Sequence, residues 1–160
     1  MMTVLSPVPF ADQHILVNLM QLCQHDYSEF DGEDVNGHGL YGYKWLDHYW
    51  TEGDRYPFLI TVDGKIAGFA LVRDRSELGG DSIPHSVAEF FVLRKYRRRG
   101  VGKDAARQVF AALPPGKWVV TQSLTNTPAQ AFWHVVIGEF TGGRFSETQD
   151  GHYNIMEFTT

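Results

Sequence analysis

A cluster of cations and glycines at residues 97–103 is the part of this sequence best suited to bind a ligand. Its members are Arg97, Arg98, Arg99, Gly100, Val101, Gly102 and Lys103. Arginine offers paired N–H donors to a phosphate and lysine offers a point charge, while glycine lets an anion approach the backbone. These residue types in this order indicate a site for a phosphorylated ligand.

The flanking residues place this cluster between a strand and a helix. Residues 87–93 are rich in Val and Phe and predict a buried strand, whereas apolar residues recur at helical spacing from Val101 to Leu113. The first N–H groups of a helix have no partner within the helix, and the helix dipole adds positive potential there. The predicted helix start therefore reinforces an anion site at Gly100 and Gly102.

Two other glycine-rich phosphate motifs fit the sequence poorly. A P-loop requires Gly-x-x-x-x-Gly-Lys-Ser/Thr, but Asp104 follows Lys103 here. Residues 100–105 satisfy the dinucleotide pattern Gly-x-Gly-x-x-Gly/Ala, but the acidic residue expected about twenty positions later is missing. Neither motif explains the cluster.

The order Arg97-x-x-Gly100-x-Gly102, after an apolar strand and before an amphipathic helix, resembles the signature of the GNAT superfamily of acyl-CoA N-acyltransferases. The resemblance covers most of residues 56–140 and includes Asn126 to Trp133, which is similar to the family's Asn-x-x-Ala-x-x-x-Tyr helix. It implies an α/β fold in one domain over residues 1–160. In that fold a mixed, mostly antiparallel central sheet is splayed between its fourth and fifth strands and flanked by helices.

The same resemblance implies where coenzyme A would bind. In the family the turn and helix start hold the pyrophosphate, here Arg97, Arg98, Arg99, Gly100, Val101, Gly102 and Lys103. The splayed strand binds the pantetheine arm through its backbone, here at Phe90, Phe91 and Val92. Asn126 matches a family residue that contacts this arm, although the alternative is a simple helix cap. Trp133 stands where many members carry a tyrosine that protonates the departing sulfur, and indole cannot serve as that acid.

Glu89 is the candidate general base. Acyl transfer to an amine requires the neutral amine, whereas an alkylammonium has a pKa near 10.4 in water. A charged residue inside a predicted buried strand is unfavourable without a reason, and family members often place a glutamate here that acts through water. Strict alternation would put Glu89 on one face with His85, Val87 and Phe91. His85 is a second candidate, as a proton relay or replacement base.

The charge distribution suggests a cationic acceptor. Residues 1–60 hold nine acidic and two basic residues, whereas residues 91–107 hold seven basic residues and one acidic residue. The acceptor-side candidates are Tyr27, Glu29, Phe30 and Asp31 in the acidic stretch 26–40, which alternatively is only a solvated loop. The acceptor would be a small cationic amine, a protein N-terminus or a lysine.

The remaining elements are predicted from local signals. We expect a strand at 4–8, a helix at 11–26, a loop at 26–40 and a short helix at 43–52. Strands at 56–62 and 65–72 are joined by Asp63-Gly64, the pair that favours a tight hairpin turn. After a connection at 73–84 and the signature strand and helix, we expect a strand at 118–123, a helix at 127–137 and a last strand at 152–159.

Composition narrows the function classes. A charged fraction of 21%, a hydrophobic fraction of 43% and a net charge of −5 are typical of an ordinary globular protein. The single cysteine, Cys23, and the absence of a long apolar run predict a cytoplasmic protein without a membrane partner. The histidines lack ligand spacing, so no metal is expected. A nucleic-acid site at residues 94–107 is disfavoured by the overall acidity.

The prediction is therefore an acetyl-CoA-dependent N-acetyltransferase that works by direct attack in a ternary complex. The alternative is a non-catalytic acyl-CoA-binding regulatory module. The sequence does not determine whether the donor carries an acetyl or a longer acyl group, or whether the protein is a monomer or a homodimer.

Overall fold

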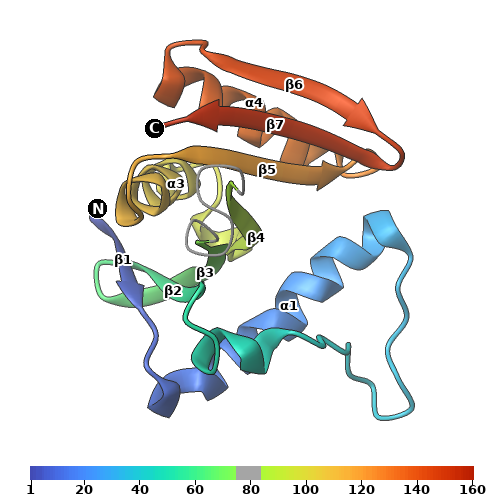
Figure 1. Ribbon diagram of the computed structural model, residues 1–160. Coiled ribbons are helices and arrows are strands. Elements are labelled where there is room, and N and C mark those ends of the chain that lie inside the picture. Colours follow the sequence, from blue (N-terminus) through green and yellow to red (C-terminus); the bar gives the residue numbers. More distant parts are fainter. Residues whose placement is uncertain (75–83) are drawn as a thin grey trace.

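In the computed structural model, which describes residues 1–74 and 84–160, the chain folds around one mixed β-sheet with helices on both faces (Figure 1). The described strands are ordered β1-β2-β3-β4-β5-β7-β6. Their bounds are β1 Thr3–Pro7, β2 Arg55–Val62, β3 Lys65–Arg73, β4 His85–Val92, β5 Lys117–Ser123, β6 Phe145–Asp150 and β7 Tyr153–Thr159. Only the β4–β5 pair is parallel. The predicted fold class is confirmed.

The helices cover opposite faces because side chains alternate along the strands. Helix α1 (Gln13–Asp31) and the 3₁₀ helix η2 (Leu46–Trp50) pack on the face that includes Phe69 and Leu71 of β3. Helices α3 (Val101–Ala112) and α4 (Thr127–Thr141) pack on the opposite face, against Ala70 and Val72. We call these the α1 face and the α3/α4 face.

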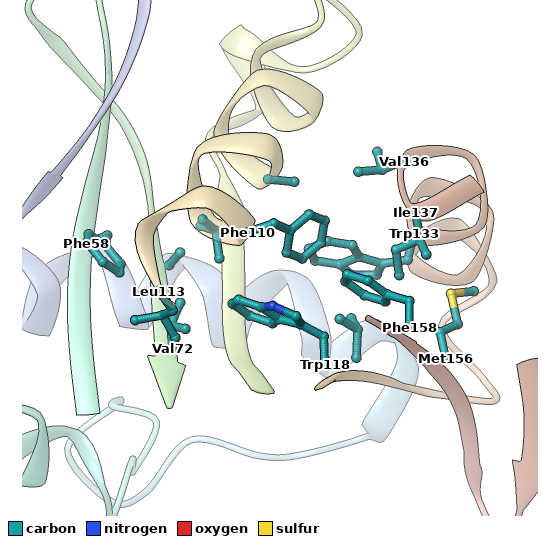
Figure 2. Close-up of a cluster of buried hydrophobic side chains, with 14 residues drawn as sticks. Phe58, Val72, Phe110, Leu113, Trp118, Trp133, Val136, Ile137, Met156 and Phe158 are labelled. Carbon is teal, nitrogen blue, oxygen red and sulfur yellow. The ribbon is translucent and has the colours of Figure 1, made fainter. Parts of the chain in front are cut away.

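Aromatic side chains fill the larger core, on the α3/α4 face (Figure 2). Phe110 of α3 lies with its ring centroid 5.2 Å from that of Trp118 and 4.9 Å from that of Phe158. Trp133 of α4 enters the same cluster and is 6% exposed. This core joins the two halves of the sheet and holds α3 against β4 and β5.

Local turn signals predicted several boundaries correctly. Asp63 and Gly64 have φ angles of 49° and 76°, as a hairpin turn with two left-handed residues requires. The side chain of Asn126 accepts a hydrogen bond from the Ala129 N–H at 3.1 Å and caps α4, which extends beyond the predicted 127–137 to Thr141. The predicted strands at 4–8, 56–62, 65–72, 118–123 and 152–159 are present within a residue or two.

Several local predictions differ from the structure. Helix α1 continues to Asp31, through the first residues of the predicted loop 26–40, and ends at Gly32 with φ 73°. Residues 43–52 form only the short 3₁₀ helix η2. Strand β6 was missed because its residues are polar and almost all exposed at the sheet edge. The 3₁₀ helices η1 (Phe10–Asp12) and η4 (Arg94–Tyr96) were not expected either. Most of the predicted connection at 73–84 lies outside the described residues.

Candidate active site

The sheet opens between β4 and β5. These strands pair only at His85↔Trp118, Ser86↔Val119 and Val87↔Val120. From residue 88 onward β4 keeps β3 as its partner on one side, whereas β5 pairs with β7. The second edge of β4 is therefore not paired with β5 from residue 88 to its end, which agrees with the predicted splay between the fourth and fifth strands.

Backbone groups of Phe90 and Val92 point to this open edge. The Phe90 carbonyl accepts a hydrogen bond from the Tyr27 hydroxyl at 3.1 Å, and the Val92 carbonyl accepts one from Arg97 Nε at 2.7 Å. Leu93, the next residue, instead donates its N–H to Ala67 of β3 at 2.8 Å. Because N–H and C=O of one residue in a strand share a direction, the N–H groups of Phe90 and Val92 also face the opening. Phe91 faces β3.

Helix α3 begins beside the opening in a geometry suited to an anion. Gly100 is its N-cap with φ 82°, and Arg98 also adopts a left-handed conformation with φ 58°. The Asp104 N–H is the first to bond within the helix, to Gly100. A Cβ at Gly102 would lie 3.0 Å from the ring of Phe132, a tight contact that glycine avoids. The predicted pyrophosphate site therefore has free helix N–H groups and a close backbone approach.

The predicted cations differ in what they contact. Arg97 forms an ion pair with Asp26, which also binds Arg94. Lys103 pairs with Glu139 of α4. Arg98 and Arg99 are exposed, and among the described residues they form no ion pair. An incoming pyrophosphate would meet Arg98 and Arg99 directly but would compete with carboxylates for Arg97 and Lys103.

Glu89 lies on the α1 face at the start of the opening. Burial raises its pKa from the ordinary 4.5 to about 7, even though a hydrogen bond from Tyr43 lowers it; the charge of Asp31 adds a smaller increase. Cys23, Tyr27 and Tyr49 also lie close enough to interact with Glu89 electrostatically, and burial raises the pKa of each. A carboxyl group with a pKa near 7 can accept a proton at neutral pH.

A β-bulge separates Glu89 from His85, which corrects the predicted alternation. Leu71 pairs with Glu89 but Val72 pairs with Val87, so Ala88 is the extra residue. Val87 therefore packs on the α3/α4 face, whereas Glu89 and Phe91 belong to the α1 face. The four residues do not share one face.

His85 is buried among structural groups. It is 3% exposed; its Nε2 lies 2.9 Å from the Pro114 carbonyl oxygen and its Nδ1 lies 3.1 Å from Asp74 Oδ1. Its ring packs against Trp118 at 5.1 Å between centroids. Both ring nitrogens thus face groups other than Glu89.

Asn126 and Trp133, the two residues expected beside the pantetheine arm, differ in exposure. Asn126 uses its side chain as the cap of α4, although the residue is partly exposed. Trp133 is buried, with its ring centroid 5.0 Å from that of Phe90. Phe132, which the sequence did not single out, also stacks on Phe90 at 5.7 Å. Two aromatic rings therefore support the β4 residue whose backbone faces the opening.

The acceptor-side candidates lie on the last turns of α1. Tyr27 is tied to β4, and the Phe30 carbonyl accepts a hydrogen bond from Thr125 Oγ1 at 3.0 Å, across the opening. Glu29 and Asp31 are both exposed, and the charge of Asp31 raises the pKa of Glu89. Tyr27, Glu29, Phe30 and Asp31 therefore belong to helix α1 and not to a loop, and whether they contact the acceptor stays a prediction.

A pocket on the α1 face was missed entirely by sequence reasoning. It has a volume of about 370 Å³ and is lined by Tyr43, Trp45, Tyr49, Arg55, Arg73 and Ala88. The available signal was an arginine immediately before one predicted hairpin strand and another immediately after its partner. We call this the arginine pocket.

Comparison with known proteins agrees with this geometry. The model of the acetyltransferase (GNAT) family matches residues 17–138, more than half of the chain. No curated protein matches the chain.

Several solved structures share the fold at low sequence identity. PaiA N-acetyltransferase from Thermoplasma acidophilum in complex with coenzyme A has a TM-score of 0.65 and 12% identity, covering 100% of each chain. Ribosomal-protein-S18-alanine N-acetyltransferase from Escherichia coli has a TM-score of 0.64 and 17% identity, covering 99% of this chain and 94% of its own. Spermidine N-acetyltransferase from Vibrio cholerae in complex with coenzyme A and spermine has a TM-score of 0.64 and 10% identity, covering 98% and 95%.

A sheet that opens between β4 and β5, with a helix N-terminus beside the opening, defines a protein of the acyl-CoA-dependent acyltransferase class. The chain belongs to the acetyltransferase (GNAT) family.

Two further properties concern only the part of the chain that the structure describes. None of its helices combines the length and apolar character needed to cross a membrane. Within residues 1–74 and 84–160, no three His, Cys, Asp or Glu side chains are grouped so that they could hold a metal ion.

Proposed function

We propose that this protein transfers an acetyl group from acetyl-CoA to a primary amine, by direct attack of the amine in a ternary complex. One observation carries the proposal: Glu89, whose pKa is about 7, stands on β4 where its pairing with β5 ends. A proton acceptor is thus next to the backbone groups that would hold the thioester.

Coenzyme A would bind across the opening. The N-terminal N–H groups of α3, together with Arg98 and Arg99, would hold the pyrophosphate, with Arg97 and Lys103 released from their carboxylates. The backbone of Phe90 and Val92 would bind the pantetheine arm. The bound cofactor supplies an activated acyl group and a thiol leaving group.

Side chains and backbone groups of the protein would then accept the proton and stabilise the developing charge. Glu89 accepts a proton from the ammonium through a water molecule, which frees the nitrogen lone pair to attack the thioester carbonyl; the new C–N bond then forms, the C–S bond breaks and coenzyme A leaves as the thiolate. The Val92 N–H, at the open edge, stabilises negative charge that develops on the carbonyl oxygen. A thiol of pKa around 8.5 leaves as a thiolate near neutral pH, so Trp133 need not act as an acid. The relay role of His85 stays a prediction, and it would require a polar path from its ring to Glu89.

The number of acidic residues in the N-terminal half overstates how many are free to bind a cationic acceptor. Asp26, Glu52 and Asp54, three of the nine acidic residues in 1–60, are already paired with arginines within the chain. The proteins of similar fold include one named for spermidine and one named for an alanine of ribosomal protein S18. We therefore keep the proposal at a primary amine, either of a small molecule or of a protein.

The test is release of free thiol from acetyl-CoA in the presence of a panel of amines, read with a thiol-reactive dye. Release that depends on both substrates, with the acetylated amine identified by mass spectrometry, supports the proposal. Saturable binding of acetyl-CoA without release would instead support the non-catalytic acyl-CoA-binding module.

A further inference from the structure

The arginine pocket places one guanidinium group, that of Arg55, against two aromatic rings. Arg55 lies with its guanidinium carbon 5.4 Å from the ring centroid of Tyr49 and 6.0 Å from that of Trp45. Lys44 also lies over Trp45, at 4.8 Å. Because cations of the chain already cover these rings, the pocket is not an aromatic cage for a cationic ligand.

The two arginines are direct neighbours across the β2–β3 ladder. Arg55 pairs with Arg73 in register, and like charges in directly opposite positions destabilise a sheet. Glu52 and Asp54 offset part of this repulsion, with contacts of 2.8 Å to Arg55 Nε and 3.3 Å to Arg73 Nη2. Each contact uses one nitrogen, and a guanidinium has five N–H donors.

Arg73 keeps a donor that the described part of the chain does not satisfy. Its Nε is buried and has no hydrogen-bond partner among residues 1–74 and 84–160. The guanidinium of Arg55 is held nearly buried, with 10% of its side chain exposed. A half-buried, partly unpaired arginine pair that lines a pocket is suited to bind a carboxylate, which accepts two parallel N–H donors.

The pocket adjoins Glu89. Ala88, the bulged residue next to Glu89, lines it, and so do Tyr43 and Tyr49, which both interact with Glu89. Glu89 pairs with Leu71, two residues before Arg73 on β3. Strand geometry therefore separates the Cα atoms of Glu89 and Arg73 by roughly 8 Å. An amine at Glu89 and an anion at Arg73 can belong to one small molecule.

The anion in this pocket would not come from coenzyme A. The helix start that suits the pyrophosphate belongs to α3, on the opposite face of the sheet from Tyr49 and the pocket. We infer that the acceptor amine carries a carboxylate, bound by Arg55 and Arg73, and an apolar or aromatic body beside the lining rings of Tyr43, Trp45 and Tyr49, as in an aromatic amino acid. This inference rests on the proposed function and specifies its second substrate.

Matched pairs of amines test the inference on the unaltered enzyme. Phenylalanine and phenethylamine differ only in the carboxylate, as do tryptophan and tryptamine, and spermidine represents a purely cationic acceptor. We expect kcat/KM to be at least about tenfold higher for the carboxylate member of each pair, the loss typical of one charge-assisted hydrogen bond. Equal or higher kcat/KM for phenethylamine, tryptamine or spermidine overturns the inference but leaves the proposed function standing.

Arg73→Gln should reduce the ratio of kcat/KM between the amine with a carboxylate and the amine without it toward one. The reason is that the glutamine amide lacks the charge and the paired donors of arginine. Arg144→Gln, at an exposed arginine beyond α4, is the matched control and should keep the preference. Thermal unfolding and coenzyme A binding confirm that each variant is folded, and Arg55→Gln replaces Arg73→Gln if the latter does not fold. A preference unchanged in both pocket variants contradicts the assignment.

Direct binding separates the two proposals. 3-Phenylpropionate carries the carboxylate and the ring but no amine, so its affinity reports the pocket without turnover. We expect calorimetric binding that Arg73→Gln weakens at least about tenfold. Binding of this kind without turnover of any amine refutes the proposed function alone, whereas no binding at millimolar concentration refutes the carboxylate site.

Discussion

Replacement of Glu89 with glutamine is the most informative perturbation of the proposed chemistry. With a pKa of about 7, the Glu89 carboxylate is about one tenth ionised at pH 6 and about nine tenths ionised at pH 8. General base catalysis typically contributes about 10²- to 10⁴-fold. We therefore expect kcat/KM of the native enzyme to rise tenfold per pH unit up to pH 7 and then to level off.

The kcat/KM of the Glu89→Gln variant depends on the small fraction of amine that is already neutral in solution. That fraction grows tenfold per pH unit up to the pKa of the amine, near 10.4. The native enzyme should thus exceed the variant by about 10²- to 10⁴-fold below pH 7, and this advantage should shrink about tenfold per unit above it. The assay is initial thiol release at subsaturating amine from pH 5.5 to 9.5, at constant ionic strength. A variant profile that still bends near pH 7, or a constant ratio across the range, would refute Glu89 as the base.

The same substitution has an independent signature in stability. The pKa of Glu89 is higher in the folded state, about 7 against 4.5, so the folded state favours the protonated carboxyl. The associated stability is fully present below pH 4.5 and is lost as pH rises through 7, which amounts to about 3 kcal/mol at pH 8. Glutamine avoids this loss. Melting curves should show Glu89→Gln several degrees more stable than the native protein at pH 8 and nearly unchanged at pH 5; equal shifts at both values would contradict a buried ionisable Glu89.

Substitutions at three further positions test other parts of the proposed site. Tyr43→Phe removes the hydrogen bond that lowers the pKa of Glu89, so the bend in the pH–rate profile should move above pH 7; a shift to lower pH would be inconsistent with this contact. Gly100→Glu adds a negative side chain at the left-handed N-cap of α3 and should abolish coenzyme A binding in calorimetry while the far-ultraviolet circular dichroism is kept; unchanged affinity would remove the anion site. Trp133→Ala should lower the free energy of unfolding, measured with denaturant, by about 3–5 kcal/mol because Trp133 is buried. Trp133→Phe should leave the pH dependence of kcat/KM unchanged. Loss of activity at alkaline pH in Trp133→Phe would indicate that Trp133 takes part in a proton transfer.

Local sequence determined much of this protein. The apolar strand, the glycines at 100 and 102 and the amphipathic helix after them are signals that act within a few residues, and all three elements form as predicted. The Asp63-Gly64 turn sets its own backbone angles, because few other residues adopt left-handed conformations easily. Asn126 likewise begins α4 through a hydrogen bond three residues away. The family resemblance rested on these local features, which is why the fold class followed from them.

Tertiary structure decided the contacts that give the site its chemistry. The bulge at Ala88 depends on the register of β4 against β3, and it moves Glu89 away from the face of His85. The Arg55–Arg73 pair likewise exists only because β2 and β3 align in one register. No window of neighbouring residues contains either relation, since each joins positions on different strands. Desolvation of Glu89 has the same origin: its pKa depends on what α1 and η2 place around it, and the strand sequence alone does not contain that information.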